Sequence, residues 1–206
     1  MANVDDTFEN GVWIQRKRTS SGYTWTVSGS IWNNVKLRTK LNGTYQQRFP
    51  AYFGAENHFK DYQFFVEWHR EQIGYGRGYD LDSDILKQNK KIYSENTCLL
   101  VPQQLNRFLQ TYNKPKNDNL PQGITVVRNK YRACCKVVNE VTGKQVNVLD
   151  KYFDKLDDAV CAYDQTKTEC AKVWVERLES GEFTVDQRVI DYMKNWKWVT
   201  SMEGFA

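Results

Sequence analysis

Residues 124–149 read ITVVRNKYRACCKVVNEVTGKQVNVL, and this stretch decides the fold of the second half of the chain. Three of its segments alternate polar and apolar residues or are rich in β-branched residues: 124–127, 131–138 and 145–149. Such runs predict β-strands. The short polar segments between them, 128–130 and 139–144, are typical of turns. The stretch therefore predicts a three-stranded antiparallel sheet.

A helix of about 25 residues is predicted after the sheet. Asp154 is the expected N-cap, and Asp157 falls in the first turn, where a carboxylate is favoured by the helix dipole. Gly181 marks the end of this helix, and Thr184 is expected to cap a last helix that runs through Trp198. A sheet backed by one long helix gives this half an α+β architecture.

The first half is predicted to contain helices and two short strands. Helices are expected over 30–40 and, more strongly, over 56–73, where aromatic and aliphatic residues recur at helical spacing before Gly74. A strand over 80–85, a polar loop and an apolar run over 97–101 come next. Pro102 suits the first turn of a helix that ends near residue 109. The predicted order is strand, loop, strand, helix.

The linker candidate is TYNKPKNDNLPQ, residues 111–122, which has two prolines and no periodicity. It divides the chain into a domain of residues 1–110 and a domain of residues 123–206. Both belong to the α+β class: a ββα module comes first, and a three-stranded antiparallel sheet packed on a long helix follows.

Composition excludes several classes of protein. The 206 residues include 14% aromatic residues, which is too many for a disordered chain. No apolar run is long enough to cross a bilayer, and no signal peptide is visible at the N-terminus, so a cytoplasmic location is expected. Five cysteines without a C-x-x-C spacing and only two histidines argue against a disulfide framework or a structural zinc site.

Charge is distributed unevenly, although the net charge is only +4. Glu140 is the one acid within residues 124–149, whereas the same stretch has five bases: Arg128, Lys130, Arg132, Lys136 and Lys144. The compensating acids begin at Asp150. The predicted sheet can therefore present a basic face to a polyanion such as nucleic acid.

The second half resembles the Apetala, or ethylene-response-factor, type of DNA-binding domain, which occurs in plants and in phage and bacterial proteins. The resemblance depends on LPQGITVVRNKYRACC (120–135) and LDKYFDKLDDAVCAYDQTK (149–167). The matching positions are Gly123, Tyr131, Arg132, Ala133, Phe153, Ala159, Ala162 and Tyr163. It implies that the sheet lies in the major groove and that Arg128, Lys130, Arg132, Lys136 and Lys144 contact bases and phosphates. The alternative is an ordinary solvated sheet face.

The first half resembles a divergent branch of the HNH nucleases of phages. The stretch that carries this resemblance is YDLDSDILKQNKKIYSENTCLLVPQQLN, residues 79–106, supported by residues 30–40 and 59–79. The resemblance implies a single divalent metal ion, Mg²⁺ or another cation, and metal-dependent phosphodiester hydrolysis. Asp82 stands at the position of the first metal ligand and Asn106 at that of the second.

This chain departs from the HNH pattern at the general base. Ser83 stands where the histidine belongs, and serine cannot take a proton from water at neutral pH without a base of its own. Thr97 replaces the asparagine that braces the loop, with Asn89 as an alternative brace, and Asp84 is the candidate substitute base. We expect His69 to be a packed core histidine and His58 to lie at the surface.

The sequence thus predicts a double-stranded DNA-binding protein of the phage HNH homing-endonuclease class, a hydrolase whose nicking or cleavage activity is left open. The alternative is an inactive HNH-derived scaffold that regulates through DNA binding or inhibits a host protein. A membrane partner is not expected, and the oligomeric state is left open. If the chain is phage-encoded, its location is the cytoplasm of the bacterial host.

Overall fold

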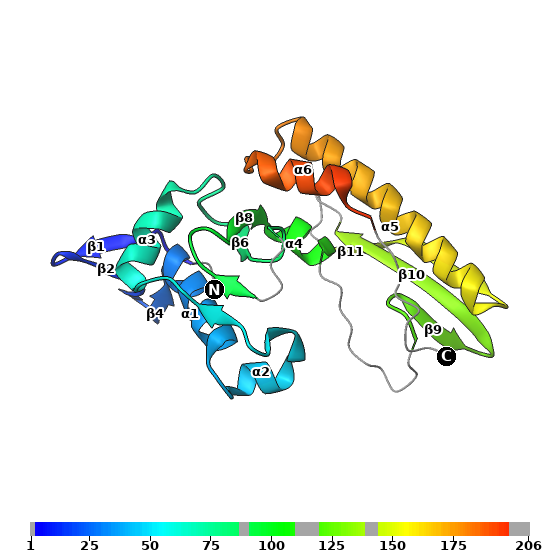
Figure 1. Ribbon diagram of the computed structural model, residues 1–206, viewed down its shortest axis with the longest axis horizontal. Coiled ribbons are helices and arrows are strands. Elements are labelled where there is room, and N and C mark those ends of the chain that lie inside the picture. The colour runs from blue at the N-terminus through cyan, green and yellow to red at the C-terminus, as the bar shows by residue number, and fades with distance from the viewer. Residues whose placement is uncertain (1–2, 87–90, 110–119, 139–143, 198–206) are drawn as a thin grey trace. The chain divides into compact units, whose positions relative to one another are not determined.

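The structure is a computed structural model that describes residues 3–86, 91–109, 120–138 and 144–197. It divides into two compact units (Figure 1). The first comprises residues 1–103 with 183–189, and the second comprises residues 104–182 with 190–206. The predicted linker falls mostly outside the described residues, and the predicted domain boundaries stay a prediction. The predicted α+β class is confirmed.

The first unit begins with two β-hairpins that lead into helices. The hairpins pair β1 (Thr7–Glu9) with β2 (Val12–Ile14) and β3 (Arg16–Thr19) with β4 (Gly22–Trp25). The elements that follow are α1 (Val27–Thr39), α2 (Thr44–Arg48), the 3₁₀ turn η1 (Pro50–Tyr52) and α3 (Tyr62–Glu71).

Helix α3 is shorter than the predicted helix over 56–73. Its N-cap is Asp61, whose carboxylate accepts a hydrogen bond from the backbone N–H of Phe64 at 2.9 Å. Glu56 and Asn57 instead form β5 (Glu56–Asn57), which pairs in parallel with β7 (Ile92–Tyr93). Helices α1 and α3 pack through aromatic rings, with the Trp32 and Phe65 centroids 5.2 Å apart. Val35 of α1 and Val66 of α3 belong to the same buried hydrophobic core.

The predicted order of strand, loop, strand and helix is found. Strand β6 (Tyr79–Asp82) pairs antiparallel with β8 (Leu99–Pro102), and α4 (Gln103–Leu109) follows β8 directly. Strand β6 ends at Asp82, earlier than predicted, because the Asp82 side chain bonds the backbone that follows it and turns the chain there.

The second unit contains the predicted antiparallel sheet of three strands. They are β9 (Ile124–Val127), β10 (Lys130–Val138) and β11 (Gln145–Phe153), in the order β11-β10-β9. Arg128 and Asn129 join β9 to β10 with φ angles of 51° and 60°. Positive φ at both positions is typical of the type I′ turn that two-residue hairpins favour. Strand β11 extends four residues beyond the predicted end at Leu149. Before that end, its pairing with β10 is irregular opposite Cys135 and Lys136.

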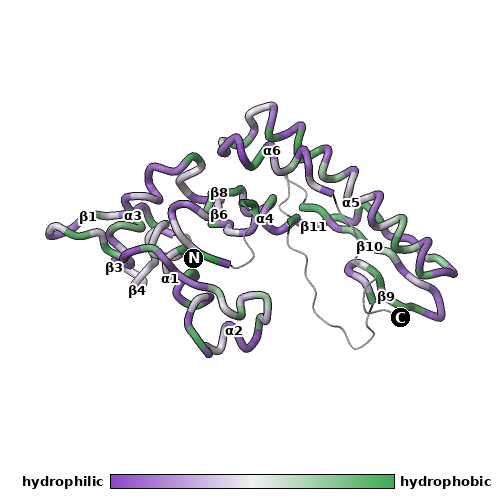
Figure 2. The backbone as a smooth tube through the Cα atoms, in the orientation of Figure 1, coloured by the Kyte–Doolittle hydropathy of each residue, from purple (hydrophilic) through white to green (hydrophobic). Residues whose placement is uncertain are grey.

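Helix α5 (Leu156–Glu179) packs against one face of this sheet. Ile124, Ala133 and Leu149 from the strands meet Ala159 and Tyr163 from the helix in a buried cluster. Figure 2 shows hydrophilic and hydrophobic residues interleaved along α5, as expected of a helix with one covered face. The backbone just before β9 packs tightly against α5. A Cβ atom on Gly123, whose φ is +80°, would lie 2.0 Å from the Tyr163 ring.

Two details of the predicted helices in this unit are wrong. The N-cap of α5 is Lys155 rather than Asp154, and no side chain caps it. The Asp154 carboxylate lies 3.1 Å from the Lys130 ammonium instead, in a salt bridge. The last helix, α6 (Gln187–Asn195), ends before Trp198, which lies outside the described residues. Among the described residues, no helix has the length and apolar character needed to cross a membrane.

Candidate nucleic-acid interface and candidate metal site

The face of the sheet that α5 leaves uncovered carries three of the five predicted DNA-binding side chains. Residues along β10 alternate in direction, and the core contains Tyr131, Ala133 and Cys135. The alternate positions Lys130, Arg132 and Lys136 therefore point to the other face. Lys130 and Lys136 are exposed, and the Arg132 side chain is one-third exposed. The strand thus presents a row of cations on one surface.

Arg132 is held in a fixed orientation by Asp150 across the β10–β11 pair. Its Nε and Nη2 atoms donate to the two carboxylate oxygens of Asp150 at 2.6 and 2.7 Å. The amide Nδ2 of Asn147 donates to Asp150 at 3.0 Å. The hydrogen bonds from Arg132 lower the pKa of Asp150, with further lowering from Asn147 and Lys136. The fork uses Nε and Nη2, so the Nη1 donors take no part in it.

The remaining two predicted DNA-binding residues lie at the ends of the strands. Arg128 is exposed in the turn between β9 and β10, and Lys144 is exposed directly before β11. Sequence reasoning missed Asp150 on this face because β11 was predicted to end at Leu149, and it missed Asn147 although that residue lies within the predicted strand. In the register of the sheet Asp150 lies opposite Cys134, diagonal to Arg132, and the irregularity at Val148 places Asn147, three positions before Asp150, on the same face.

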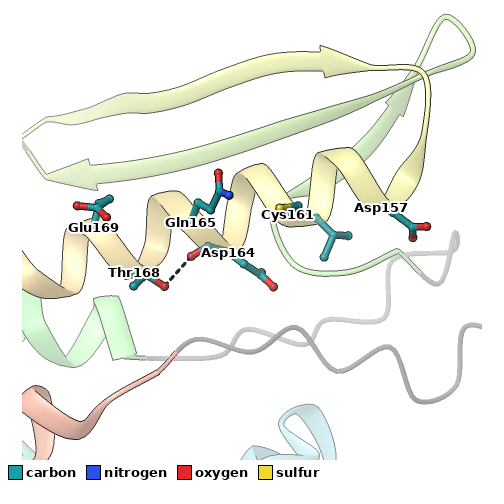
Figure 3. Close-up of a pocket in the computed structure, with 7 residues that line it drawn as sticks. Asp157, Cys161, Asp164, Gln165, Thr168 and Glu169 are labelled. Atoms are coloured by element: carbon teal, nitrogen blue, oxygen red, sulfur yellow. Dashed lines mark hydrogen bonds between the residues drawn. The ribbon is translucent and has the colours of Figure 1, made fainter.

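The opposite side of the second unit is acidic. A shallow surface hollow runs along α5, and Figure 3 shows the Asp157 and Asp164 side chains pointing away from the sheet. Glu169, which forms a salt bridge with Lys172 at 2.9 Å, lies at the other end of the hollow. Carboxylates repel phosphate, so of these two surfaces only the uncovered sheet face suits a polyanion.

The turn after β6 holds the predicted metal ligand Asp82. Its Oδ1 accepts hydrogen bonds from the backbone N–H groups of Asp84 at 2.8 Å and Ile85 at 2.9 Å. Only 9% of Asp82 is exposed, and this burial raises the pKa of its carboxyl group. Both bonds go to Oδ1, so Oδ2 is the oxygen that can face a cation.

Asn106, the second predicted ligand, is buried on α4 in the second unit. Carboxylate and amide oxygens suit Mg²⁺, which keeps several waters and needs only one or two protein ligands. Asp82 fits that requirement by its chemistry. The described residues contain no group of three or more His, Cys, Asp or Glu side chains arranged for a metal ion. The pairing of Asp82 with Asn106 stays a prediction.

Ser83, which occupies the general-base position, has a tyrosine for a neighbour. Ser83 is buried and hydrogen-bonds Tyr93, and burial raises the pKa of Tyr93 to about 12. A phenol with that pKa stays protonated at neutral pH and cannot activate the serine. Asp84, the candidate substitute base, is exposed and its Oδ2 lies 2.6 Å from the Lys91 ammonium.

The other predicted positions in this segment have separate outcomes. Asn89 lies outside the described residues. Thr97 is buried, and its Oγ1 accepts a hydrogen bond from the Ser94 backbone N–H at 3.0 Å, so it stabilises the turn before β8.

The two histidines are placed as expected. His69 is completely buried on α3, and its Nδ1 lies 2.7 Å from the Ser28 hydroxyl, which in turn hydrogen-bonds Asp6. Burial lowers the pKa of His69 to about 4. His58 is half exposed and its Nε2 lies 2.8 Å from a Glu56 carboxylate oxygen. Within the described residues, no hydrogen bond or ion pair joins either histidine side chain to the Asp82 turn.

Sequence reasoning also missed the cations that accompany this turn. Lys91 pairs with Asp84, and Arg38 from α1 donates to the Tyr93 hydroxyl at 3.5 Å. Arg38 lies more than forty positions before the turn in the sequence, and no local pattern links the two.

Comparisons with protein-family models, curated proteins and solved structures found no match to this chain.

Proposed function

We propose that this protein binds double-stranded DNA through the uncovered face of the β9–β11 sheet. The observation that carries the proposal is the row of Lys130, Arg132 and Lys136 along β10, opposite the face that α5 covers. A sheet can enter the major groove, and Lys and Arg side chains there neutralise phosphates or pair with guanine. The acidic surface of α5 favours the same orientation, because it keeps the helix side away from the phosphates.

Arg132 is the base-reading candidate, and the lysines are the phosphate-binding candidates. A guanidinium fixed by a bidentate carboxylate loses little conformational entropy when it meets a base. The Asp150 carboxylate also offsets part of the positive charge of Arg132, so this face selects its DNA site by geometry as well as by charge.

The direct test is duplex binding measured by fluorescence anisotropy over a range of salt concentrations. We expect Arg132→Ala with Lys136→Ala to weaken binding by roughly 1–3 kcal/mol and to lower the salt slope by about one. Lys172→Ala is the matched control, because it removes an exposed lysine from the acidic helix side. Equal affinity for the double variant and the wild type would refute the use of the sheet.

We further propose that the first unit belongs to an HNH-type endonuclease, with Asp82 as a metal ligand and Asn106 as its partner. A bound divalent ion would stabilise the leaving oxygen of a phosphodiester. Asp84 is the candidate base, since Ser83 hydrogen-bonds the hydroxyl of Tyr93, which stays protonated. Metal-dependent nicking of supercoiled plasmid, lost in Asp82→Ala with Asn106→Ala, supports this activity.

The second candidate function is an inactive HNH-derived scaffold, and the replacement of the catalytic histidine by Ser83 favours it. Duplex binding without nicking in Mg²⁺ or Mn²⁺ would identify a DNA-binding regulator. Absence of both duplex binding and nicking would leave inhibition of a host protein.

A further inference from the structure

A cluster of cations and tyrosines lies beside the Asp82 turn in the first unit. Three elements contribute to it: Arg38 lies in the last turn of α1, Tyr52 ends η1, and Lys91 directly precedes β7, which contains Tyr93. The Arg38 guanidinium carbon lies 5.1 Å from the centre of the Tyr52 ring, and the Lys91 ammonium lies 5.0 Å from the same centre. Both positive charges therefore lie about 5 Å from the centre of the same ring.

The cluster is fixed to the turn by direct contacts. Lys91 bonds the Asp84 carboxylate at 2.6 Å, and Tyr93 hydrogen-bonds Ser83. Lys91 also lies near enough to Asp82 to lower its pKa, against the larger opposite effect of burial. An anion bound by Lys91 would thus lie close to Asp84, whose negative charge Lys91 partly offsets.

Arg38 is a half-buried cation that lacks a carboxylate within the described part of the chain. Its Nη1 donates a long bond to the Tyr93 hydroxyl at 3.5 Å, its side chain also hydrogen-bonds Tyr45, and its Nε is buried without a hydrogen-bond partner among the described residues. A guanidinium that is withdrawn from water and unmatched by an anion is costly. Its planar donors match phosphate oxygens, which makes an external phosphate group the natural counter-ion.

The tyrosines suit the same ligand. Burial raises the pKa of both Tyr52 and Tyr93, so both hydroxyls keep their protons and can donate hydrogen bonds to an anion. The backbone of Lys91 is held by the Glu56 N–H, which donates to the Lys91 carbonyl at 2.9 Å. The backbone of Lys91 is therefore positioned by the β5–β7 pair.

We propose that Arg38 and Lys91 form a phosphate-binding site that positions a phosphate group beside the Asp82–Ile85 turn. The ligand class is a phosphate monoester or diester. The identification of that phosphate as one of duplex DNA rests on the proposed function, whereas the binding site itself does not.

The first experiment tests the site with inorganic phosphate alone. The full-length ¹⁵N-labelled protein is titrated with sodium phosphate, and with sodium chloride at matched ionic strength. We expect saturable shifts of the backbone signals of residues 83–85 and 92–93, with a dissociation constant on the order of millimolar. Absence of saturable shifts in the wild type would overturn the site.

Variants then assign the site to these cations. Arg38→Gln with Lys91→Gln should weaken phosphate binding at least about tenfold. Arg38→Lys should retain part of the binding, because it keeps the charge but loses the planar donors. Lys36→Gln, on the exposed side of α1 two positions away, should match the wild type. The same spectra show whether each variant is folded, and unchanged binding in the folded double variant would overturn the assignment.

The second experiment asks whether the phosphate belongs to DNA. We expect Arg38→Gln to lower the salt slope of duplex binding by about one, as the loss of a phosphate contact does. Saturable phosphate shifts with a wild-type slope would overturn the DNA assignment and leave a site for free phosphate. If wild-type protein shows phosphate shifts but binds no duplex, the proposed DNA-binding function fails and the site stands.

Discussion

Lowering the pH from 7 to 5 should destabilise the first unit through His69. The imidazole is completely buried, stacks on the Phe65 ring at a centroid distance of 5.4 Å, and bonds the Ser28 hydroxyl through Nδ1. Its Nε2 is also buried and has no hydrogen-bond partner among the described residues. Burial lowers the pKa of His69 to about 4, against a partial opposing effect of Asp6.

The magnitude follows from the two protonation equilibria. An unfolded histidine has a pKa of about 6.5, so between pH 6.5 and pH 4 the unfolded chain binds a proton that the folded chain rejects. Stability is therefore fully present above pH 6.5 and falls as the pH decreases towards 4. The loss between pH 7 and pH 5 is about 2 kcal/mol, and the limit at lower pH is about 3 kcal/mol.

The assay is urea unfolding followed by circular dichroism at several pH values. His69→Gln, which removes the titrating group, should lose about 2 kcal/mol less than the wild type between pH 7 and pH 5. His58→Gln is the matched control, because it removes the other histidine, whose side chain is half exposed. The reasoning is wrong if the wild type and His69→Gln lose the same free energy of unfolding over that interval.

Three further changes test the fold and the sheet face. Gly123→Ala should lower the free energy of unfolding by about 3 kcal/mol in urea, because the new methyl group meets the Tyr163 ring at a position with positive φ. A decrease of less than about 1 kcal/mol would contradict this packing. Asp150→Ala should reduce discrimination between duplexes with and without guanine, because Arg132 loses its orientation. The total affinity for DNA should stay within about threefold, because Arg132 keeps its charge. Competition binding measures both quantities, and unchanged discrimination would refute the orienting role of Asp150. Asp61→Ala should cost about 1 kcal/mol through loss of the α3 N-cap, and an unchanged urea midpoint would count against the cap.

The parts of the fold that the sequence predicted are those with local signals. The type I′ turn at Arg128 and Asn129 separates two β-branched runs, and the long helix α5 carries its own apolar stripe. The strand ends were less predictable, because they depend on partners far away in sequence. Strand β11 continues past Leu149 since β10 supplies hydrogen bonds as far as Tyr131 opposite Phe153.

The candidate metal ligand Asp82 was singled out from a contiguous segment of sequence, and its role stays a prediction. Arg38 could not be singled out in this way, because its role depends on α1 bringing it to Tyr93, 55 positions later. Asp150 was assigned to the acidic part of the chain, although the pairing of β10 and β11 places it beside Arg132.

Among the described strands β11 pairs with β10 alone, so its other side offers backbone N–H and C=O groups that could recruit a strand from a second copy. The irregularity beside Val148 breaks the regular spacing of those groups, and Asp150 and Lys151 add charges of both signs just beyond it. Irregular spacing and side-chain charge are the devices by which natural sheets resist edge-to-edge aggregation. A variant with a straightened β11 would accordingly gain a propensity to form intermolecular β-structure.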